Sequence, residues 1–434
     1  MAQALVRFLR AQYTEHNGER VRLLGGVFAI FGHGNVAGLG EALEDVGDEL
    51  PVFRAHNEQA MAHAAIGYAK ALRRRRLMAC TSSVGPGATN MVTAAAVAHV
   101  NRLPLLLLPG DTFASRLPDP VLQQVEDFAN PTVTANDCFR PVSRYWDRIL
   151  RPEQLLQSLP QAMSVLTDPA DCGPVTLALP QDVQAEAWDF PDSFFEPVLH
   201  RFSRPGPDRD DLTDAANLLG GAKRPIIIAG GGVHYSDAAR SLADFSLKHG
   251  IPVTETQAGK GALPWTHEYN AGAIGVTGTQ AANELAEKAD LVIAVGTRLQ
   301  DFTTGSGLLI RRPDVPMLCI NTARHDLNKG STVSLRGDAL RCLEELDETI
   351  TGLLVEASWS ASASALRDRW NTVVDDVTSP ADRARPSDAE VIGVVNRRFA
   401  RDATVVCAAG GLPGELHKLW RSSDTDSYHV EYGY

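Results

Sequence analysis

The chain has 434 residues, 44% of them hydrophobic and 22% charged, and its formal net charge is -12. This composition is typical of a globular protein of about three domains, and the negative charge argues against nucleic acid or a membrane surface as the main partner. The six scattered cysteines have no zinc-site spacing, and there is no signal-peptide pattern or membrane-length apolar run, so a cytoplasmic protein is expected.

The N-terminal part of the chain is expected to alternate helices with strands. Apolar residues at helical spacing predict a helix over residues 4–13. Residues 25–31 form a predicted strand, which leads into a loop with two glycines, Gly32-His33-Gly34-Asn35. A short apolar run at residues 50–53 predicts a second, buried strand.

A helix is predicted directly after the second strand. Asn57 is suited to cap it, which places Glu58 at the helix start, where a negative charge is stabilised. Apolar residues between positions 60 and 72 recur every three or four residues, so one face of this helix is expected to be buried. A strand at residues 77–80, a Gly85-Pro86-Gly87 turn and an Ala-rich helix follow.

Later segments predict a second domain and two linkers. A strand is predicted at residues 104–108, and residues 173–183 resemble the closing strand of a known domain family. Together they complete a first domain of parallel βα units over residues 1–185. Residues 186–210 hold prolines and aspartates without periodicity and are expected to be a linker. A second α/β domain is expected over residues 211–356, with strands at residues 224–229, 251–254, 290–295 and 316–320.

The run Gly230-Gly231-Gly232 follows the first strand of the second domain. It lacks the third glycine of a dinucleotide-binding fingerprint, so close backbone packing explains it better than a bound dinucleotide does.

The C-terminal part is expected to begin a third domain. A Ser-, Ala- and Asp-rich stretch at residues 357–386 is expected to be a second linker. A helix over residues 389–399 and a strand over residues 403–407 then lead into a glycine-rich turn, within a third segment at residues 387–434.

Three motifs in this order resemble the pyrimidine-binding domain of thiamine-diphosphate (ThDP) enzymes of the acetolactate-synthase type. They are Asn57-Glu58-Gln59-Ala60, Gly67-Tyr68-Ala69 and Gly85-Pro86-Gly87-Ala88-Thr89-Asn90. The ordered set is specific, whereas a lone glutamate or a lone Gly-Pro-Gly turn would mean little. The resemblance implies a parallel-sheet α/β architecture with a pyrimidine-binding domain, a Rossmann-like central domain and the start of a diphosphate-binding domain.

The resemblance also assigns site residues. In the family, a buried carboxylic acid bonds the aminopyrimidine ring and helps to form the carbanion at C2, so Glu58 is the expected catalytic residue; the alternative is an ordinary first-turn carboxylate. Cofactor contacts are expected from Gly32, His33, Gly34, Gly85, Pro86, Gly87 and Asn90. For His33, an exposed loop histidine without a role is an equal alternative. A glutamine near the thiazolium is expected in this family, and both Gln123 and Gln124 fit.

The segment with Gly410, Gly411, Leu412 and His417 resembles the opening of the family's diphosphate-binding domain. Backbone amides there are suited to phosphate oxygens, and an ordinary glycine-rich turn is the alternative. The family's Mg²⁺ motif lies further downstream, so the metal ligands are expected outside this sequence and the third domain is expected to be incomplete. The central domain holds FAD in some relatives and nothing in others, and the sequence does not decide between them.

Further runs resemble the branch of the family that hydrolyses a C–C bond of a cyclic 1,2-dione in inositol catabolism. They lie at residues 25–36, 117–120, 408–420 and 431–434. This resemblance implies conversion of trihydroxycyclohexane-1,2-dione to 5-deoxyglucuronate at a site shared between the subunits of a homodimer or homotetramer. The alternatives are an acetolactate synthase or glyoxylate carboligase, a sulfoacetaldehyde acetyltransferase, or a truncated ThDP-fold protein without activity.

Overall fold

The structure is a computed structural model that describes residues 1–434 except 119, 126, 311, 383, 400–402 and 432–434. Asp119 and the residues from Tyr432 to Tyr434, which belong to two of the motifs above, therefore lie outside the described residues. The chain divides into two compact units, one formed by Met1–Ser203 and one that begins at Arg204, and each is described by itself. None of the helices in the described parts combines the length and apolar composition that a membrane crossing needs.

The first unit is built on a six-stranded, all-parallel sheet in the order β4-β3-β5-β6-β8-β7. The strands are β3 (Leu24–Ala29), β4 (Val52–Arg54), β5 (Leu77–Ser82), β6 (Leu105–Asp111), β7 (Tyr145–Arg148) and β8 (Pro174–Pro180). Strands β5, β6 and β8 are buried along their whole length, as the continuous apolar runs of a sheet covered on both faces require. The parallel α/β architecture confirms the predicted fold class.

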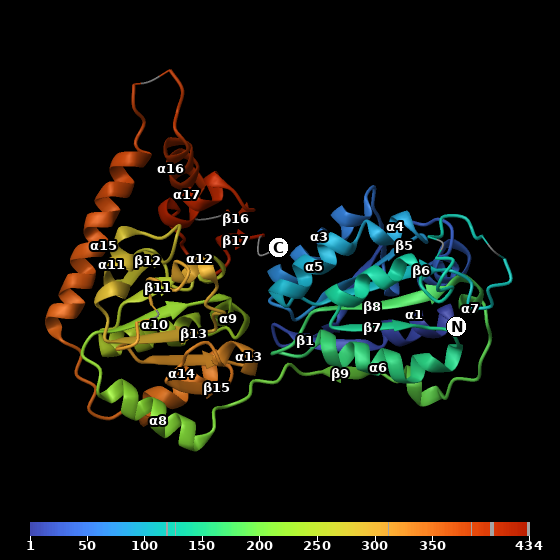
Figure 1. The fold of residues 1–434 in the computed structure, drawn as a ribbon, viewed down its shortest axis with the longest axis horizontal. Coiled ribbons are helices and arrows are strands. Elements are labelled where there is room, and N and C mark those ends of the chain that lie inside the picture. The colour runs from blue at the N-terminus through green and yellow to red at the C-terminus, as the bar shows by residue number, and fades with distance from the viewer. Residues whose placement is uncertain (119, 126, 311, 383, 400–402, 432–434) are drawn as a thin grey trace. The chain divides into compact units, whose positions relative to one another are not determined.

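Helices cover both faces of this sheet (Figure 1). Helices α1 (Ala2–Arg10), α2 (Glu41–Val46) and α6 (Leu155–Leu166) share one hydrophobic core with it, whereas α3 (Glu58–Ala71) and α5 (Val92–Asn101) pack on the other face. Two short helices, α4 (Pro86–Thr89) and α7 (Gln181–Gln184), directly follow strand ends. The predicted N-cap is confirmed, because the Asn57 side chain accepts a hydrogen bond from the Ala60 amide.

Residues 186–203 differ from the expected irregular linker. They contain a short 3-10 turn, η5 (Asp192–Phe195), and β9 (Val198–His200), which pairs in parallel with β1 (Gln12–His16). Strand β2 (Glu19–Arg22) pairs antiparallel on the other side of β1 and completes a small sheet. The Phe194 ring stacks on Phe8 of α1 at 4.8 Å between centroids, a contact between distant segments that no local periodicity reports.

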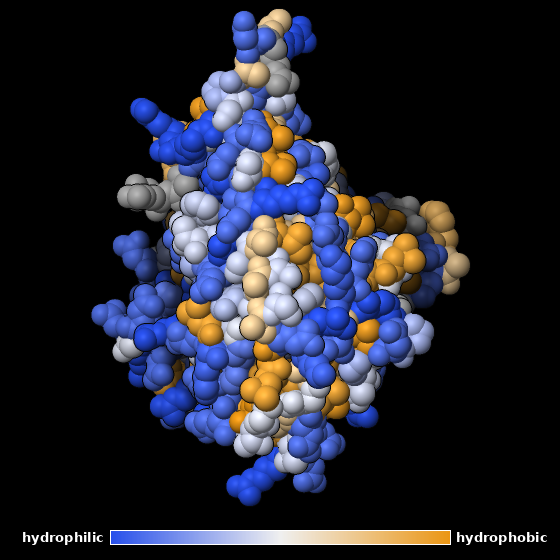
Figure 2. All heavy atoms as spheres, turned by 90° about the vertical axis from the view of Figure 1, so that its left-hand side faces the viewer, coloured by the Kyte–Doolittle hydropathy of each residue, from blue (hydrophilic) through white to orange (hydrophobic). Residues whose placement is uncertain are grey.

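The second unit begins with another parallel six-stranded sheet, in the order β12-β11-β10-β13-β14-β15. The strands are β10 (Pro225–Ala229), β11 (Val253–Glu255), β12 (Asn270–Ala273), β13 (Leu291–Val295), β14 (Met317–Asn321) and β15 (Val333–Arg336). The helices that precede, separate and follow these strands are α8 (Arg209–Gly220), α9 (Gly231–Tyr235), α10 (Ala239–His249), α11 (Gln280–Lys288), α12 (Asp301–Thr304), α13 (Arg324–Leu327) and α14 (Ala339–Thr349). Polar side chains cover most of the face shown in Figure 2, and apolar ones form small groups between them.

The Gly230-Gly231-Gly232 run is packed against neighbouring backbone, as expected. A Cβ on Gly230 would lie 2.4 Å from the Gly296 carbonyl oxygen, and a Cβ on Gly232 would lie 2.6 Å from the Gly296 Cα. The Gly232 amide also donates a hydrogen bond of 2.9 Å to the Gly296 carbonyl. The glycines therefore allow the close approach of two turns at the carboxyl ends of β10 and β13.

Residues 357–386, expected to be a linker, contain the 22-residue helix α15 (Ala357–Thr378). Trp359 and Ala363 are buried in the core on one face of the central sheet, and Val374 is buried in the core of the C-terminal segment. These apolar positions recur at helical spacing. Most other residues of the stretch are small or polar, so its overall composition indicated a linker and not a helix.

The C-terminal segment packs within the second unit. It comprises α16 (Asp388–Phe399), β16 (Val405–Cys407), α17 (Gly411–Leu419) and β17 (Tyr428–Val430), and the two strands pair in parallel. Its small core includes Ile392, Leu416 and Trp420.

Candidate functional site

The predicted pyrimidine-site residues meet at the carboxyl ends of the strands in the first unit. The loop after β3 carries His33, the helix after β4 begins with Glu58, and the turn after β5 contains Gly85 and Gly87. In open parallel sheets, ligands bind at this edge because the loops there converge. The topology thus brings together residues that three separate segments of the sequence supply.

The two oxygens of the Glu58 carboxylate have different surroundings. Oε2 accepts a hydrogen bond of 2.8 Å from the Asn90 side-chain amide. Oε1 lies 3.2 Å from the position that a Cβ on Gly87 would occupy. Glu58 is half-buried at the first turn of α3, where the helix N-terminus stabilises its charge.

Gly87 packs closely against the end of β5. A Cβ on residue 87 would also lie 2.5 Å from the Ser83 hydroxyl oxygen, so a larger residue there requires the Ser83 side chain to move. Ser83 is buried at the end of β5, and the sequence did not single it out. Glycine at position 87 therefore allows the turn after β5 to pack closely against Ser83 and the Glu58 carboxylate.

The loop of Gly32, His33 and Gly34 lies against the turn that follows β5. The Val84 amide donates a hydrogen bond of 2.9 Å to the His33 carbonyl, and Gly34 has a φ of +97°. The buried Asn35 side chain holds the loop by accepting from the Gly32 amide and donating to Thr81. His33 itself is half-buried and so has one side directed to solvent.

The structure distinguishes the two candidate glutamines. The main-chain carbonyl of Gln123 lies so close to Gly85 that a Cβ there would be 1.7 Å from its oxygen. Gly85 has a φ of +68°, which also favours glycine. The Gln124 side chain instead accepts a hydrogen bond of 2.9 Å from the Val121 amide inside its own loop. Gln123 is thus the residue that contacts the turn, while a cofactor contact by either side chain stays a prediction.

Sequence reasoning missed an ion-pair network at the carboxyl end of β6. The Arg148 guanidinium contacts Asp111 at 2.6 Å and Asp137 at 2.7 Å. Nearby, the Asp182 carboxylate accepts from the Ala114 and Ser115 amides. Burial alone would raise the pKa of Asp182, but these backbone hydrogen bonds hold it below its usual range. A signal was present, because Asp111 and Asp182 each follow a buried apolar strand.

The residues predicted to bind the diphosphate lie in the second unit, and they differ in how far they are exposed. Gly410, with a φ of +131°, precedes α17, and Gly410, Gly411 and Leu412 are exposed. His417 is buried, and its Nδ1 lies 2.9 Å from the Thr277 hydroxyl. Burial, with the Lys260 cation as a smaller cause, lowers the pKa of His417 to about 3. His417 therefore lies on the inward face of α17 and not with the exposed turn.

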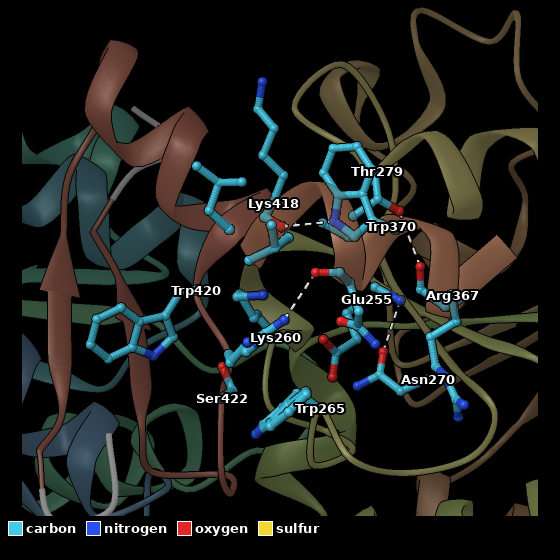
Figure 3. A pocket seen from close by; sticks show the side chains of 17 residues that line it. Glu255, Lys260, Trp265, Asn270, Thr279, Arg367, Trp370, Lys418, Trp420 and Ser422 are labelled. Carbon is cyan, nitrogen blue, oxygen red and sulfur yellow. Dashed lines mark hydrogen bonds between the residues drawn. The ribbon is translucent and has the colours of Figure 1, made fainter. Parts of the chain in front are cut away.

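A pocket in the second unit contains none of the residues that the sequence assigned (Figure 3). About 480 Å³ of space, part of it open to solvent, lies between the central sheet, α15 and the segment after α17. Glu255 and Lys260 are buried beside it, and Trp265 and Trp370 also line it. Burial raises the pKa of Glu255 and lowers that of Lys260, while their opposite charges act in the reverse direction.

Within the residues that the structure describes, no group of three or more His, Cys, Asp and Glu side chains is arranged to hold a metal ion.

Two family models of thiamine pyrophosphate enzymes match this chain. Residues 2–130 match the profile described as "Thiamine pyrophosphate enzyme, N-terminal TPP binding domain", and residues 212–346 match "Thiamine pyrophosphate enzyme, central domain". Thiamine pyrophosphate is another name for ThDP.

Curated relatives cover the whole chain. It is 46% identical over 457 aligned positions to "3D-(3,5/4)-trihydroxycyclohexane-1,2-dione hydrolase 2" of Bacillus cereus, which accounts for 100% of this chain and 71% of that protein. Proteins named "3D-(3,5/4)-trihydroxycyclohexane-1,2-dione hydrolase" from Bacillus anthracis and Clostridium tetani match with the same identity and coverage. The chain therefore belongs to the thiamine pyrophosphate enzyme family, among relatives of the trihydroxycyclohexane-1,2-dione hydrolases.

Proposed function

We propose that this chain takes part in the ThDP-dependent hydrolysis of a C–C bond in a cyclic 1,2-dione, which converts trihydroxycyclohexane-1,2-dione to 5-deoxyglucuronate. The observation that carries the proposal is the Glu58 carboxylate, with one oxygen bonded by Asn90 and the other beside Gly87, in a chain 46% identical to hydrolases of this name.

The residues of the first unit fit the pyrimidine end of ThDP. A Cβ at position 87 would lie 2.5 Å from the Ser83 hydroxyl oxygen and 3.2 Å from Glu58 Oε1, so glycine there lets the turn approach the carboxylate closely. We assign Gly85, Gly87 and the Gly32-His33-Gly34 loop to the walls of the cofactor site. In the second unit, we assign the exposed amides at Gly410, Gly411 and Leu412 to the diphosphate, because peptide N–H groups at a helix start attract anions.

Bound ThDP supplies the electron sink of the reaction. Glu58 Oε1 is the atom that we assign to hold a proton toward the aminopyrimidine ring, because Oε2 is already engaged by Asn90. Asn90 orients the carboxylate, and a carboxylate held in one orientation exchanges a proton more efficiently than a rotating one. Overall, the bond between the two carbonyl carbons breaks and one molecule of water is added. One carbon becomes a carboxylate, and the other gains a proton and becomes an aldehyde.

The proposal includes a second subunit and a metal. Glu58 belongs to the first unit and Gly410 to the second, and we propose that they act in different copies of a homodimer or homotetramer in the cytoplasm, with a site between subunits. We propose Mg²⁺ as the partner of the diphosphate, since hard oxygen ligands suit it.

The first experiment is an isothermal titration of the chain with ThDP and Mg²⁺, followed by an assay with the cyclic dione. Formation of 5-deoxyglucuronate, detected by NMR, supports the proposal, and formation of acetolactate from pyruvate would support the carboligase alternative. If the folded chain binds ThDP but converts neither substrate, the hydrolase proposal is wrong.

The variant Glu58→Gln tests the catalytic assignment. It keeps the size of the side chain but removes the proton-sharing carboxyl group, so we expect at least about a hundredfold loss of turnover, within the range of general acid–base effects. The melting temperature and the far-UV spectrum should stay those of the parent chain. Exchange of the ThDP C2 proton at the parental rate in this variant would rule out the role of Glu58.

A further inference from the structure

The segment between β6 and the 3-10 helix η3 (Ala135–Val142) forms a long loop beside the candidate site. Gln123 brings this loop against Gly85, at a distance that leaves no room for a Cβ on residue 85. Leu117, Leu122 and Phe128 are 87%, 67% and 94% exposed, whereas Val121 is buried. Because most large apolar side chains of the loop are exposed, contacts at its ends contribute strongly to its position.

One side chain, Arg148 on β7, binds both ends of this loop. At the start, its Nε donates to Asp111 Oδ2 at 2.6 Å. At the far end, its terminal nitrogens donate to the Thr132 carbonyl at 3.0 Å and the Thr134 hydroxyl at 2.8 Å. One of them also donates to Asp137 Oδ2 at 2.7 Å. The planar guanidinium, with its fixed fork of donors, suits this double attachment and a lysine ammonium does not.

The far end of the loop is itself well ordered by local bonds. Thr134 and Asp137 form a reciprocal capping box at the start of η3. Asp137 also pairs with Arg140, whose guanidinium lies 3.6 Å from the centre of the Trp146 ring. Burial alone would raise the pKa of Asp137, but the Thr134 amide and the two arginines lower it, so the carboxylate stays charged. The cluster balances two cations against two carboxylates.

The charges at the start of the loop are buried. Asp111 is 1% exposed at its side chain and Arg148 is 14% exposed. Removing one member of such a pair leaves an uncompensated buried charge, which is more unfavourable than the loss of an exposed ion pair. The loop ends consequently cannot separate without disrupting this pair.

We infer that Arg148 is a positioning residue, which ties together the two ends of loop 112–134 and so holds Gln123 against the Gly85 turn of the candidate site. The inference rests on the proposed function only for its catalytic consequence. The physical attachment can be tested without turnover.

The test compares Arg148→Lys and Arg148→Gln with the matched control Arg151→Gln. Arg151 lies three positions after Arg148, and its side chain is 75% exposed. Hydrogen exchange of each folded variant is followed by mass spectrometry. We expect peptides covering residues 112–134 and 83–91 to exchange about tenfold faster in both Arg148 variants, the factor that a loss of about 1.4 kcal/mol produces. Peptides from β3 and β8, and all peptides of Arg151→Gln, should keep the parental rates.

A kinetic readout separates positioning from general destabilisation. In Arg148→Lys we expect the KM for the dione or the Kd for ThDP to rise, because an error of about 1 Å in placement can cost roughly a hundredfold in rate or binding. Parental exchange at residues 112–134 in a folded variant overturns the inference, and so does a uniform increase over the whole sheet. If the parent chain does not hydrolyse the dione, the proposed function fails, while the exchange pattern still decides the role of Arg148.

Discussion

The Asn90 side-chain amide donates a 2.8 Å hydrogen bond to Glu58, which joins the end of α4 to the first residue of α3 across 32 positions of sequence. The bond occupies one carboxylate oxygen and leaves the other beside Gly87. The turn after β5 therefore sets the orientation of the carboxylate that follows β4.

The first prediction concerns this bond. In Asn90→Ala the carboxylate loses its orienting donor, so we expect turnover to fall roughly tenfold to a hundredfold, in line with the loss of a hydrogen bond to a charged group. The control is Thr89→Ala, which removes an exposed hydroxyl from the neighbouring position. Equal activities of the two variants in the dione assay would contradict the orienting role.

The second prediction concerns the different effects on stability of replacing Gly85 and Gly67, two glycines of the motifs that resemble the ThDP enzymes. Gly85 has a φ of +68° and faces the Gln123 carbonyl, so Gly85→Ala should lower the free energy of unfolding by more than the strain of about 1–2 kcal/mol that a left-handed residue imposes. Gly67 lies in α3 with nothing within 4 Å of its added Cβ, so Gly67→Ala should raise stability by about 1 kcal/mol. Urea denaturation measures both. A neutral Gly85→Ala would mean that the loop at Gln123 is free to move away.

The third prediction is a pH dependence of stability that comes from His417. Its pKa is about 3 in the folded chain and near 6.5 when unfolded, so the unfolded state binds more protons between these values. The contribution of His417 is then fully present above about pH 6.5 and falls by about 1.4 kcal/mol for each unit as the pH decreases toward 3. Carboxylates titrate in the same window, so the measurement is the difference between the parent chain and His417→Gln in urea at pH 7 and pH 5. Parallel pH profiles for the two proteins would show that His417 accepts a proton in the folded state.

The fourth prediction tests whether α15 belongs to the folded core. Trp359 is 4% exposed and its indole N–H donates to the Pro225 carbonyl at 2.9 Å. Trp359→Ala should lower the free energy of unfolding by about 3–5 kcal/mol, whereas the exposed Ser362→Ala should stay within about 0.5 kcal/mol of the parent chain. A flexible linker at residues 357–386 would make the two variants indistinguishable.

The sequence by itself determined the inner strands of the two parallel sheets, but it did not indicate the edge strands β7, β12 and β15. Continuous apolar runs indicate buried parallel strands, and Asn57 followed by Glu58 indicates a helix start. Both signals lie within a few neighbouring residues. The resemblance to a family motif identified the glycines at positions 85 and 87, and the structure gave the physical reason for them, because a Cβ at either position would clash with its neighbours.

Only the tertiary structure decided which distant groups meet. Arg148 and Asp111 are 37 positions apart, and nothing in either local segment reports that one guanidinium binds both ends of the loop between β6 and η3. The burial of His417 against Thr277 and the packing of α15 likewise come from contacts between segments that are far apart in the sequence. Such contacts depend on how whole elements pack, and the free energy of burial that selects them is a property of the assembled core, absent from any short stretch of the chain.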